Sequence, residues 1–289
     1  MKTVFSIVFA FLCAIAYSAQ VLTLPASEAV SPGMWLCYRM NLYLEDEPSD
    51  VELRIAADSK YWLWVNGELQ VREGGLKRGP NPKDTYCDVL RGAQGLREGD
   101  NTVAVLVWYF GKDGFSHRNS PTPGLAFHLS VDGKVLDTDK AWKVCRHPAY
   151  YLPEGEEPNY RLPESNIGFD AAKDIAFQQP DYDDSSWSKA RRVSLEEAGW
   201  NQLVDRPIPQ WKDYGLKTYT RTERQGNQIL AYLPYNAQIT PYLKVKSVAG
   251  RKIDIRTDDY RGGSATNVFA EYITREGVQE FECRGWMNG

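Results

Sequence analysis

KYWLWVNGEL, at residues 60–69, places three aromatic side chains within four positions and ends beside an Asn-Gly pair. Side chains in a strand alternate between its two faces, so Tyr61 and Leu63 point one way while Trp62 and Trp64 point the other. Both faces of this strand must therefore be covered by other parts of the protein. Asn-Gly tolerates the positive φ angles of a two-residue hairpin turn, so we expect the chain to reverse there.

The same alternation of apolar and polar residues recurs along most of the chain. The most apolar stretch, at residues 103–108, predicts a central strand because both of its faces are apolar. No window of twelve or more residues beyond the N-terminus shows helical periodicity. Further strands are expected at residues 35–45, 51–57, 125–131, 142–146, 241–248, 251–257, 269–274 and 278–283, the last two as a hairpin.

These patterns predict an all-β protein with two domains. We expect a jelly-roll, galactose-binding-like β-sandwich at residues 19–203, a Pro-rich linker at 204–215 and a second β-sandwich domain, complete or truncated, at 216–289. The linker contains RPIPQWKDYG, whose prolines stiffen the chain and cannot join a central sheet. Residues 71–86 and 111–124 are rich in Gly, Pro and charged residues, which predicts two surface loops.

The first residues have the features of a secretory signal peptide. Lys2 provides a positive start, an apolar run follows, and small residues precede position 18. We therefore expect a signal peptide at residues 1–18 and a mature protein that is secreted or periplasmic. No later stretch approaches the twenty or so apolar residues of a membrane helix, so no membrane span is expected.

The net charge limits the kinds of partner that we expect, and the cysteine spacing limits the kinds of cross-link and metal site. A net charge of -4 lacks the positive field that nucleic-acid binding requires, so nucleic acid is not an expected partner. Cys37, Cys87, Cys145 and Cys283 lie far apart in the sequence, and three pairings are conceivable for them. In a chain this long we expect buried or unpaired cysteines rather than a disulfide framework, and the spacing shows no zinc site.

Catalytic chemistry is not legible in the sequence. Acidic residues at 181–184 and 258–259 could supply the acid and base of a glycosidase, but nothing fixes the separation that such chemistry needs. Asp beside Ser and Trp is more often a turn cap, so DYDDSSW at 181–187 predicts a capped turn that buries Trp187. The three histidines lack metal-ligand spacing. No catalytic residue, metal site or cofactor is predicted.

The aromatic strand and the polar loops near it form a candidate sugar site. Flat aromatic rings pack against the CH faces of a pyranose, and polar side chains in loops can bind its hydroxyls. The other interpretation is that Trp62 and Trp64 are core residues beneath a neighbouring sheet or domain. The candidate carbohydrate-binding residues are Trp64, Asn66, Arg78, Lys83, Trp108, Lys112 and His117.

Several motifs occur in the order found in a known family. YWLWVNGEL, RGPNPKDTYCDVL and REGDNTVAVLVWYFGKDGFSH are followed by TDKAWKV, PNYRLPESNIGFDAAKD and DYDDSSWSKA. This order resembles the N-terminal β-sandwich of bacterial α-L-rhamnosidases, glycoside hydrolase family 78 and its relatives. The residues after 229 resemble the next β domain of that family.

The resemblance implies an accessory role rather than catalysis by these residues. Family members carry their catalytic acid and base in a large helical barrel downstream of the β domains, and no helical region is expected here. No catalytic residue can be carried over, so we expect an accessory part of a secreted rhamnosidase-like hydrolase. Its expected partners are a rhamnose-containing glycan and a downstream catalytic domain. The alternatives are a structural interaction module that binds no sugar and a self-sufficient glycosidase.

Overall fold

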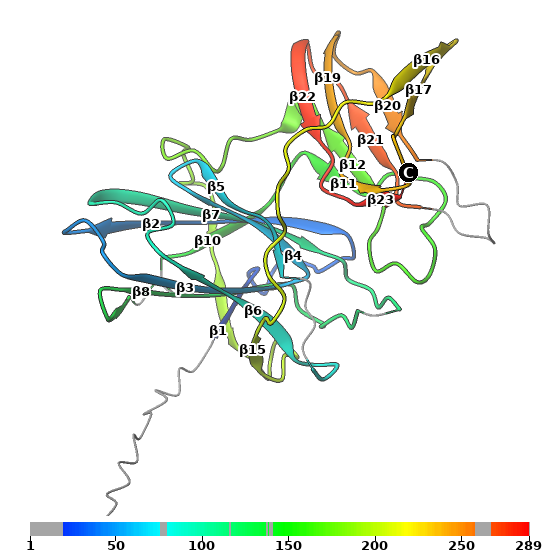
Figure 1. Cartoon of the computed structure of the whole chain (residues 1–289). Coiled ribbons are helices and arrows are strands. Elements are labelled where there is room, and N and C mark those ends of the chain that lie inside the picture. The colour runs from blue at the N-terminus through cyan, green and yellow to red at the C-terminus, as the bar shows by residue number, and fades with distance from the viewer. Residues whose placement is uncertain are drawn as a thin grey trace, which may run out of the picture.

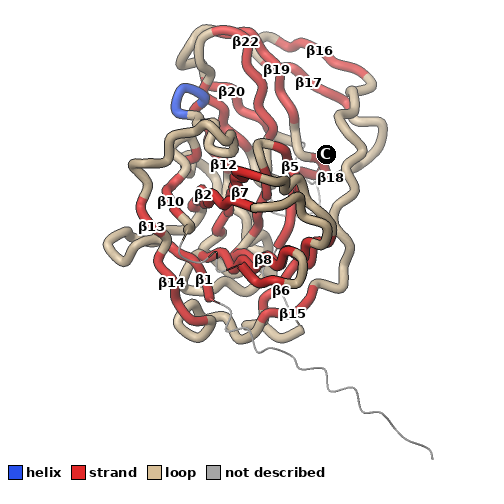
Figure 2. The backbone as a smooth tube through the Cα atoms, turned by 90° about the vertical axis from the view of Figure 1, so that its left-hand side faces the viewer, coloured by secondary structure: helices blue, strands red, loops and turns tan. Residues whose placement is uncertain are grey.

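The computed structural model describes residues 20–75, 80–115, 117–136, 138, 141–257 and 267–288. The predicted signal peptide and the candidate residue Arg78 lie outside these residues. Strands dominate the structure, and the helical structure described is a single 3-10 turn, η1 (Ala171–Lys173) (Figure 2). The predicted all-β class is confirmed. Across the described part of the chain, no helix has the length and apolar character needed to cross a membrane.

Two sheets pack face to face to form the sandwich (Figure 1). The first sheet has the order β14 (Arg191–Ser194), β1 (Gln20–Thr23), β8 (Gly124–Val131), β3 (Val51–Asp58), β6 (Thr85–Arg91) and β15 (Leu203–Asp205), with β9 (Lys134–Leu136) beside β8. The second sheet has the order β13 (Ser188–Lys189), β10 (Lys143–Arg146), β2 (Met34–Leu44), β7 (Gly99–Tyr109), β4 (Lys60–Val65) and β5 (Glu68–Gly75). The strand predicted to be central, β7, lies between β2 and β4.

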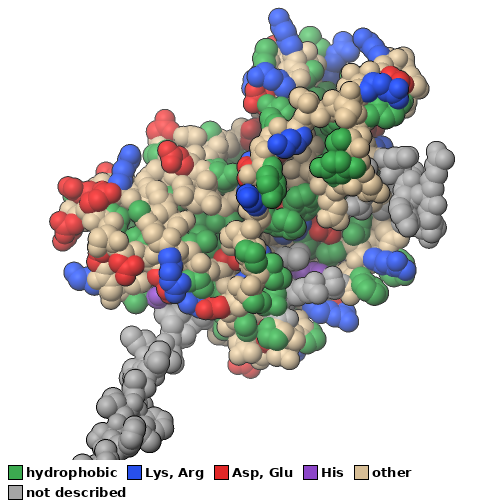
Figure 3. Space-filling view, viewed as in Figure 1, with side chains coloured by type: hydrophobic (Ala, Val, Ile, Leu, Met, Phe, Trp, Pro, Cys, Tyr) green, Lys and Arg blue, Asp and Glu red, His purple; other side chains and the backbone are tan. Residues whose placement is uncertain are grey.

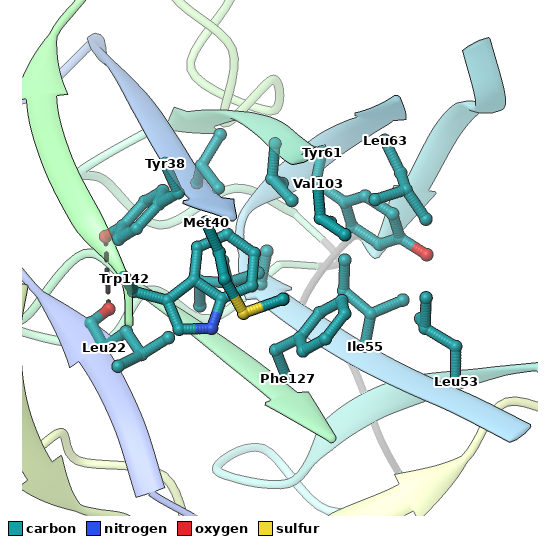
Figure 4. Close-up of a cluster of buried hydrophobic side chains, with 14 of the residues drawn as sticks. Leu22, Tyr38, Met40, Leu53, Ile55, Tyr61, Leu63, Val103, Phe127 and Trp142 are labelled. Atoms are coloured by element: carbon teal, nitrogen blue, oxygen red, sulfur yellow. Dashed lines mark hydrogen bonds between the residues drawn. The ribbon is translucent and has the colours of Figure 1, made fainter. Parts of the chain in front are cut away.

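The core between these sheets is built from alternate residues of their strands (Figure 4). Tyr38 and Met40 of β2 meet Ile55 of β3 there, and all three side chains are buried. The Tyr38 hydroxyl donates to the Leu22 carbonyl oxygen at 3.1 Å, and burial raises the pKa of Tyr38. Apolar contacts therefore fill the sandwich core, and the buried Tyr38 hydroxyl has the hydrogen-bond partner that a buried polar group needs.

The opening stretch forms the predicted hairpin. Asn66 and Gly67 have φ angles of 52° and 83°, as the turn between β4 and β5 requires. Strand β5 continues to Gly75, so the loop expected from residue 71 begins later than predicted. Gly74, which pairs with Tyr61 in this part of β5, leaves room for its ring: a Cβ there would lie 2.2 Å from Cζ of Tyr61.

A second group of strands lies against the outer face of the second sheet (Figure 1). Its largest sheet has the order β11 (Tyr150–Tyr151), β12 (Ile167–Asp170), β21 (Ala270–Ile273) and β20 (Lys252–Ile255). Three strand pairs complete it: β19 (Tyr242–Ser247) with β22 (Gly277–Glu282), β18 (Gln238–Ile239) with β23 (Met287–Asn288), and β16 (Arg221–Gln225) with β17 (Gln228–Tyr232).

The strand pairing in this group differs from the prediction. Residues 269–274 and 278–283 were expected to form a hairpin, but β21 pairs with β20 and β12 while β22 pairs with β19. Two adjacent turns carry the chain between sheets: Gly250 N donates to Thr274 O at 2.7 Å, and Thr274 Oγ1 donates to Val248 O at 2.6 Å. In addition, β11 and β12 precede the Pro-rich linker, so this sheet joins strands from both sides of it.

Candidate functional site

The aromatic residues of the opening stretch lie at the seam between the sandwich and the second group of strands. Trp62 and Trp64 point away from the sandwich core and join Trp35 and Trp108 in a separate buried cluster. The ring of Trp35 stacks on Tyr150 at a centroid distance of 3.9 Å, on Trp108 at 4.6 Å and on Trp62 at 5.7 Å. These rings are therefore core residues beneath a neighbouring sheet, which was one of the two interpretations of the sequence.

The C-terminal segment covers this aromatic face. The Arg284 guanidinium carbon lies 5.1 Å from the ring centroid of Trp62 and 5.3 Å from that of Trp64, within cation–π range. Phe177 meets Trp64 edge-on at 5.7 Å. The faces of both indole rings are thus occupied by side chains of the protein itself.

A buried ion network crosses the same seam. Lys60 is 3% exposed, and its Nζ lies 3.2 Å from Glu73 Oε1 and 3.4 Å from Glu164 Oε1. Trp286 Nε1 donates to Glu73 Oε2 at 2.7 Å. A buried charge is costly without partners. Glu73 of β5 belongs to the sandwich itself, whereas Glu164 lies between β11 and β12, so Lys60 has both carboxylate partners only while the two parts of the protein stay together.

Three of the candidate residues belong to strands β4 and β7 and to the turn that follows β4. Trp64 is 8% exposed, and Trp108 is fully buried. The amide of Asn66 donates to Gly95 O and to Asn101 Oδ1, both at 2.9 Å, and accepts from the Thr102 backbone N–H. Trp108 pairs with Lys60 at the start of β4, whereas Asn66 lies six residues further along, after the end of that strand, a separation of about 20 Å.

The remaining described candidates lie in loops. Lys83 is exposed, and its carbonyl oxygen accepts from Asn201 N at 2.9 Å. Lys112 Nζ lies 3.5 Å from Glu157 Oε2. His117 is buried, with its ring 5.3 Å from that of Phe110 and its Nε2 4.0 Å from Asp58 Oδ1. The structure does not gather the candidates into one site, and their sugar-binding role stays a prediction.

A buried arginine that the sequence reasoning missed fixes the loop at residues 177–184. Arg39 is 1% exposed, and its Nε donates to Asp184 Oδ2 at 2.8 Å. Its other N–H groups donate, at 2.9–3.3 Å, to the carbonyl oxygens of Phe177, Gln179, Pro180 and Tyr182. A guanidinium has five donors, and all of them are used here. Arg39 therefore holds this loop in one conformation.

DYDDSSW at residues 181–187, which begins within this loop, is a capped turn in part. Asp183 Oδ1 accepts from the Ser185 backbone N–H at 2.9 Å, as predicted. Asp184 instead binds Arg39 and Lys143, whose Nζ lies 2.7 Å from Asp184 Oδ1. Trp187 is half-buried rather than buried. Its exposed part faces a cleft.

The cleft lies between the loop and strand β10 and has a volume of about 370 Å³. Tyr182 and Trp187 form an edge-on pair on its wall, with ring centroids 5.7 Å apart. Arg146 Nε lies 3.6 Å from Glu28 Oε2, which adds charged donors and acceptors to the same wall. Aromatic rings beside paired charges are suited to a polar ligand with flat apolar faces, such as a sugar. Among the described residues, no group of three or more His, Cys, Asp or Glu side chains could hold a metal ion.

An exposed apolar strip follows the Pro-rich linker and the β16–β17 hairpin. Figure 3 shows hydrophobic side chains along the path that this segment takes from β15 to β16 in Figure 1. Single exposed apolar residues are ordinary, but a succession of large ones marks an interaction surface. The strip, which we define by residues between 56% and 73% exposed, contains Ile208, Trp211, Tyr214, Leu216, Ile229 and Tyr235.

Contacts on the other side hold the linker in place. Arg206 Nε lies 2.5 Å from the buried Asp88 Oδ1, and Arg72 Nη2 lies 2.9 Å from Asp213 Oδ2. The ring of Trp211 packs on Trp286 at 5.1 Å. The linker is therefore fastened to the sandwich by Arg206 and Asp213 and to the C-terminal segment by Trp211, whose ring is still more than half exposed.

Comparisons with known proteins find structural relatives. No protein-family model matches the chain, and no relative is found among the curated proteins. A family 78 rhamnosidase of Bacillus sp. GL1 is 30% identical, with a TM-score of 0.57, over 67% of this chain and 20% of that enzyme. The α-L-rhamnosidase of Aspergillus terreus is 18% identical, with a TM-score of 0.68, over 93% of this chain and 32% of its own. That of Streptomyces avermitilis, solved with L-rhamnose, is 18% identical, with a TM-score of 0.66, over 89% of this chain and 26% of its own.

These relatives are three to five times longer than the part they share with this chain. The matches at 18% identity show a common fold, while the Bacillus enzyme adds similarity in sequence over two thirds of the chain. The resemblance predicted from the motifs is confirmed: this chain corresponds to a β-sandwich part of the α-L-rhamnosidases of glycoside hydrolase family 78.

Proposed function

We propose that this chain is an accessory part of a rhamnosidase-like glycoside hydrolase and supports a catalytic domain by docking through the apolar strip. The observation that carries the proposal is the exposure of six large apolar side chains on a segment fastened to the sandwich. Burying a side chain of this size stabilises an interface by about 1.5–3 kcal/mol. A surface of this kind is suited to a large partner rather than to solvent.

The lengths of the relatives indicate what the partner is. The chain spans 20 to 33% of the rhamnosidases that it matches, so most of each enzyme lies outside the shared part. In the proposed arrangement, the domain that accompanies this β-sandwich rests against part of its surface. The strip offers the apolar area that such a contact needs.

Binding of a separately produced catalytic part tests the proposal. The probe is the Bacillus sp. GL1 rhamnosidase lacking the segment that matches this chain, mixed with the chain in analytical size exclusion. Co-elution is expected, and Leu216→Asp should abolish it. Val135→Asp is the matched control, since Val135 is also more than half exposed but lies on β9 of the first sheet. Absence of co-elution, or equal loss in both variants, would count against docking through the strip.

Carbohydrate recognition is a second candidate function, favoured by the cleft beside Trp187. Tyr182 and Trp187 offer ring surface there, and the Arg146–Glu28 pair offers polar groups for hydroxyls. Affinity electrophoresis in a rhamnose-containing polysaccharide tests it. Retardation that Trp187→Ala removes and Trp64→Ala retains would assign binding to the cleft. The reverse result would assign it to the residues predicted from sequence, and no retardation would leave the docking role alone.

Export from the cytoplasm is part of the proposal and rests on the signal-peptide pattern at residues 1–18. Expression with a C-terminal tag in a bacterial host, followed by cell fractionation and mass measurement, tests it. Recovery outside the cytoplasm, with a mass reduced by the leader, supports export. Recovery of the full-length chain from the cytoplasm alone counts against it.

A further inference from the structure

Cys37 and Cys145 lie directly opposite each other on the neighbouring antiparallel strands β2 and β10. Two residues further along the same pair of strands, the His147 N–H donates to the Trp35 carbonyl oxygen at 2.9 Å. Because hydrogen-bonded pairs recur every second residue, the cysteines occupy a hydrogen-bonded position, where Cα atoms are about 5.5 Å apart. That distance lies inside the window of about 4.4–6.8 Å in which a disulfide can form.

The two thiols lie on the same face of the sheet and differ in access. Both belong to the cluster on the outer face of the second sheet, which also includes Tyr182, and the neighbouring Cys145 contributes to the raised pKa of Cys37. Cys37 is fully buried, and burial raises the pKa of its thiol. Cys145 is half-buried and lines the cleft beside Trp187. A reagent in solution can therefore reach Cys145 first, with Cys37 placed to resolve the product.

We propose that Cys37 and Cys145 form a redox-active pair that closes to a cross-strand disulfide on reaction with small-molecule disulfides such as oxidised glutathione. The Cys145 thiolate attacks the reagent, forms a mixed disulfide and expels one glutathione thiolate. Cys37, on losing its proton, then attacks the Cys145 sulfur and expels the second glutathione. The protein loses two thiol protons and two electrons, and the reagent is reduced to two thiols.

The disulfide would fasten β10, a strand near the edge of its sheet, to β2. Strand β10 pairs with β2 over four residues, and beyond it lies the two-residue strand β13. The link closes a loop of roughly a hundred residues in the unfolded chain, which is the situation in which a disulfide restricts the unfolded state most. Strand β10, which the disulfide would secure, forms one wall of the cleft. The oxidation state of the two cysteines would therefore affect the access of a ligand to the cleft.

Thiol counting after oxidation tests the pair. The chain has a fifth cysteine, Cys13, within the predicted signal peptide, and the test uses the Cys13→Ser variant so that four thiols remain. The protein is equilibrated with oxidised glutathione, then thiols are counted in denaturant and linked peptides are mapped under non-reducing conditions. Two thiols should be lost and a single linkage between Cys37 and Cys145 found, with a Tm about 5 °C or more above that of the reduced protein.

Cys145→Ser should lose no thiols through an intramolecular link, while Cys87→Ser, on the other sheet of the sandwich, should still lose two. Unfolding of a variant is checked by near-UV circular dichroism, and the mapping of the parent protein does not depend on any variant. A mixed disulfide that persists on Cys145, a link to Cys87 or Cys283, or four intact thiols at millimolar oxidised glutathione would each overturn the proposal.

Discussion

Acid should loosen the seam between the sandwich and the second group of strands through His147. This side chain is 6% exposed, and its ring lies 4.9 Å from Tyr150 and 5.9 Å from Phe177. Burial, followed by the nearby charge of Arg284, lowers the pKa of His147 to about 4. The folded protein therefore holds a neutral imidazole at a pH where the unfolded chain already carries a charged one.

The size of the stability loss follows from the difference between the pKa of His147 in the folded protein and in the unfolded chain. With an ordinary pKa of 6.5 in the unfolded chain, stability is complete above pH 6.5 and is lost as the pH falls towards 4. Each pH unit in that window costs about 1.4 kcal/mol, so about 2 kcal/mol is lost between pH 7 and 5. Asp174 Oδ1 lies 3.7 Å from His147 Nε2, and burial raises the pKa of Asp174. Protonation of Asp174 therefore stabilises the folded protein as the pH falls, which is opposite to the effect of His147.

Urea unfolding at pH 7, 6 and 5, followed by tryptophan fluorescence, measures the effect. His147→Phe keeps a ring at the seam and removes the titrating group, so it should lose about 2 kcal/mol less than the parent between pH 7 and 5. Contributions of other carboxyl groups are common to both proteins and cancel in the difference. Asp174→Asn is the control for the neighbouring group. Equal losses in the parent and His147→Phe would refute the reasoning.

Three substitutions test the packing of the aromatic strand and its neighbours by urea unfolding at pH 7. Trp62→Ala should lower the free energy of unfolding by about 3–5 kcal/mol, since the cavity is closed on all sides; a loss below 1 kcal/mol would contradict its burial. Lys60→Met should cost about 3–5 kcal/mol because it leaves buried carboxylates unpaired, and adding Glu73→Gln should recover part of that loss rather than add to it. Gly74→Ala should cost about 1–3 kcal/mol because its Cβ collides with Tyr61.

The strands of the sandwich could be predicted because their information is local. Apolar side chains at every second position of β2, β3 and β7 meet the same core, so periodicity alone identified these strands. Asn66-Gly67 fixed the hairpin for the same reason, since the turn depends on two adjacent φ angles. The sequence also predicted that both faces of β4 are buried, and therefore that another part of the protein covers Trp62 and Trp64.

The residues that cover these two tryptophans could not be predicted from the sequence, because they lie far away along the chain. Arg284 reaches Trp62 across more than two hundred positions, and no local pattern marks that contact. Arg39 is one charged residue in an otherwise apolar strand, and its role depends on a loop about 140 residues away. The pairing of β21 failed for the same reason, since neighbouring strands in sequence were assumed to be neighbours in the sheet.

The interleaving of β12 with β21 limits how this polypeptide can be divided. Ile167 of β12 lies in parallel register with Ala270 of β21, although the Pro-rich linker separates them along the chain. A protease that nicks the exposed linker should leave two fragments bound together as a non-covalent complex. A gene fragment ending before the linker would instead release a polypeptide with an unpaired strand edge beside uncovered tryptophans, a combination that favours aggregation.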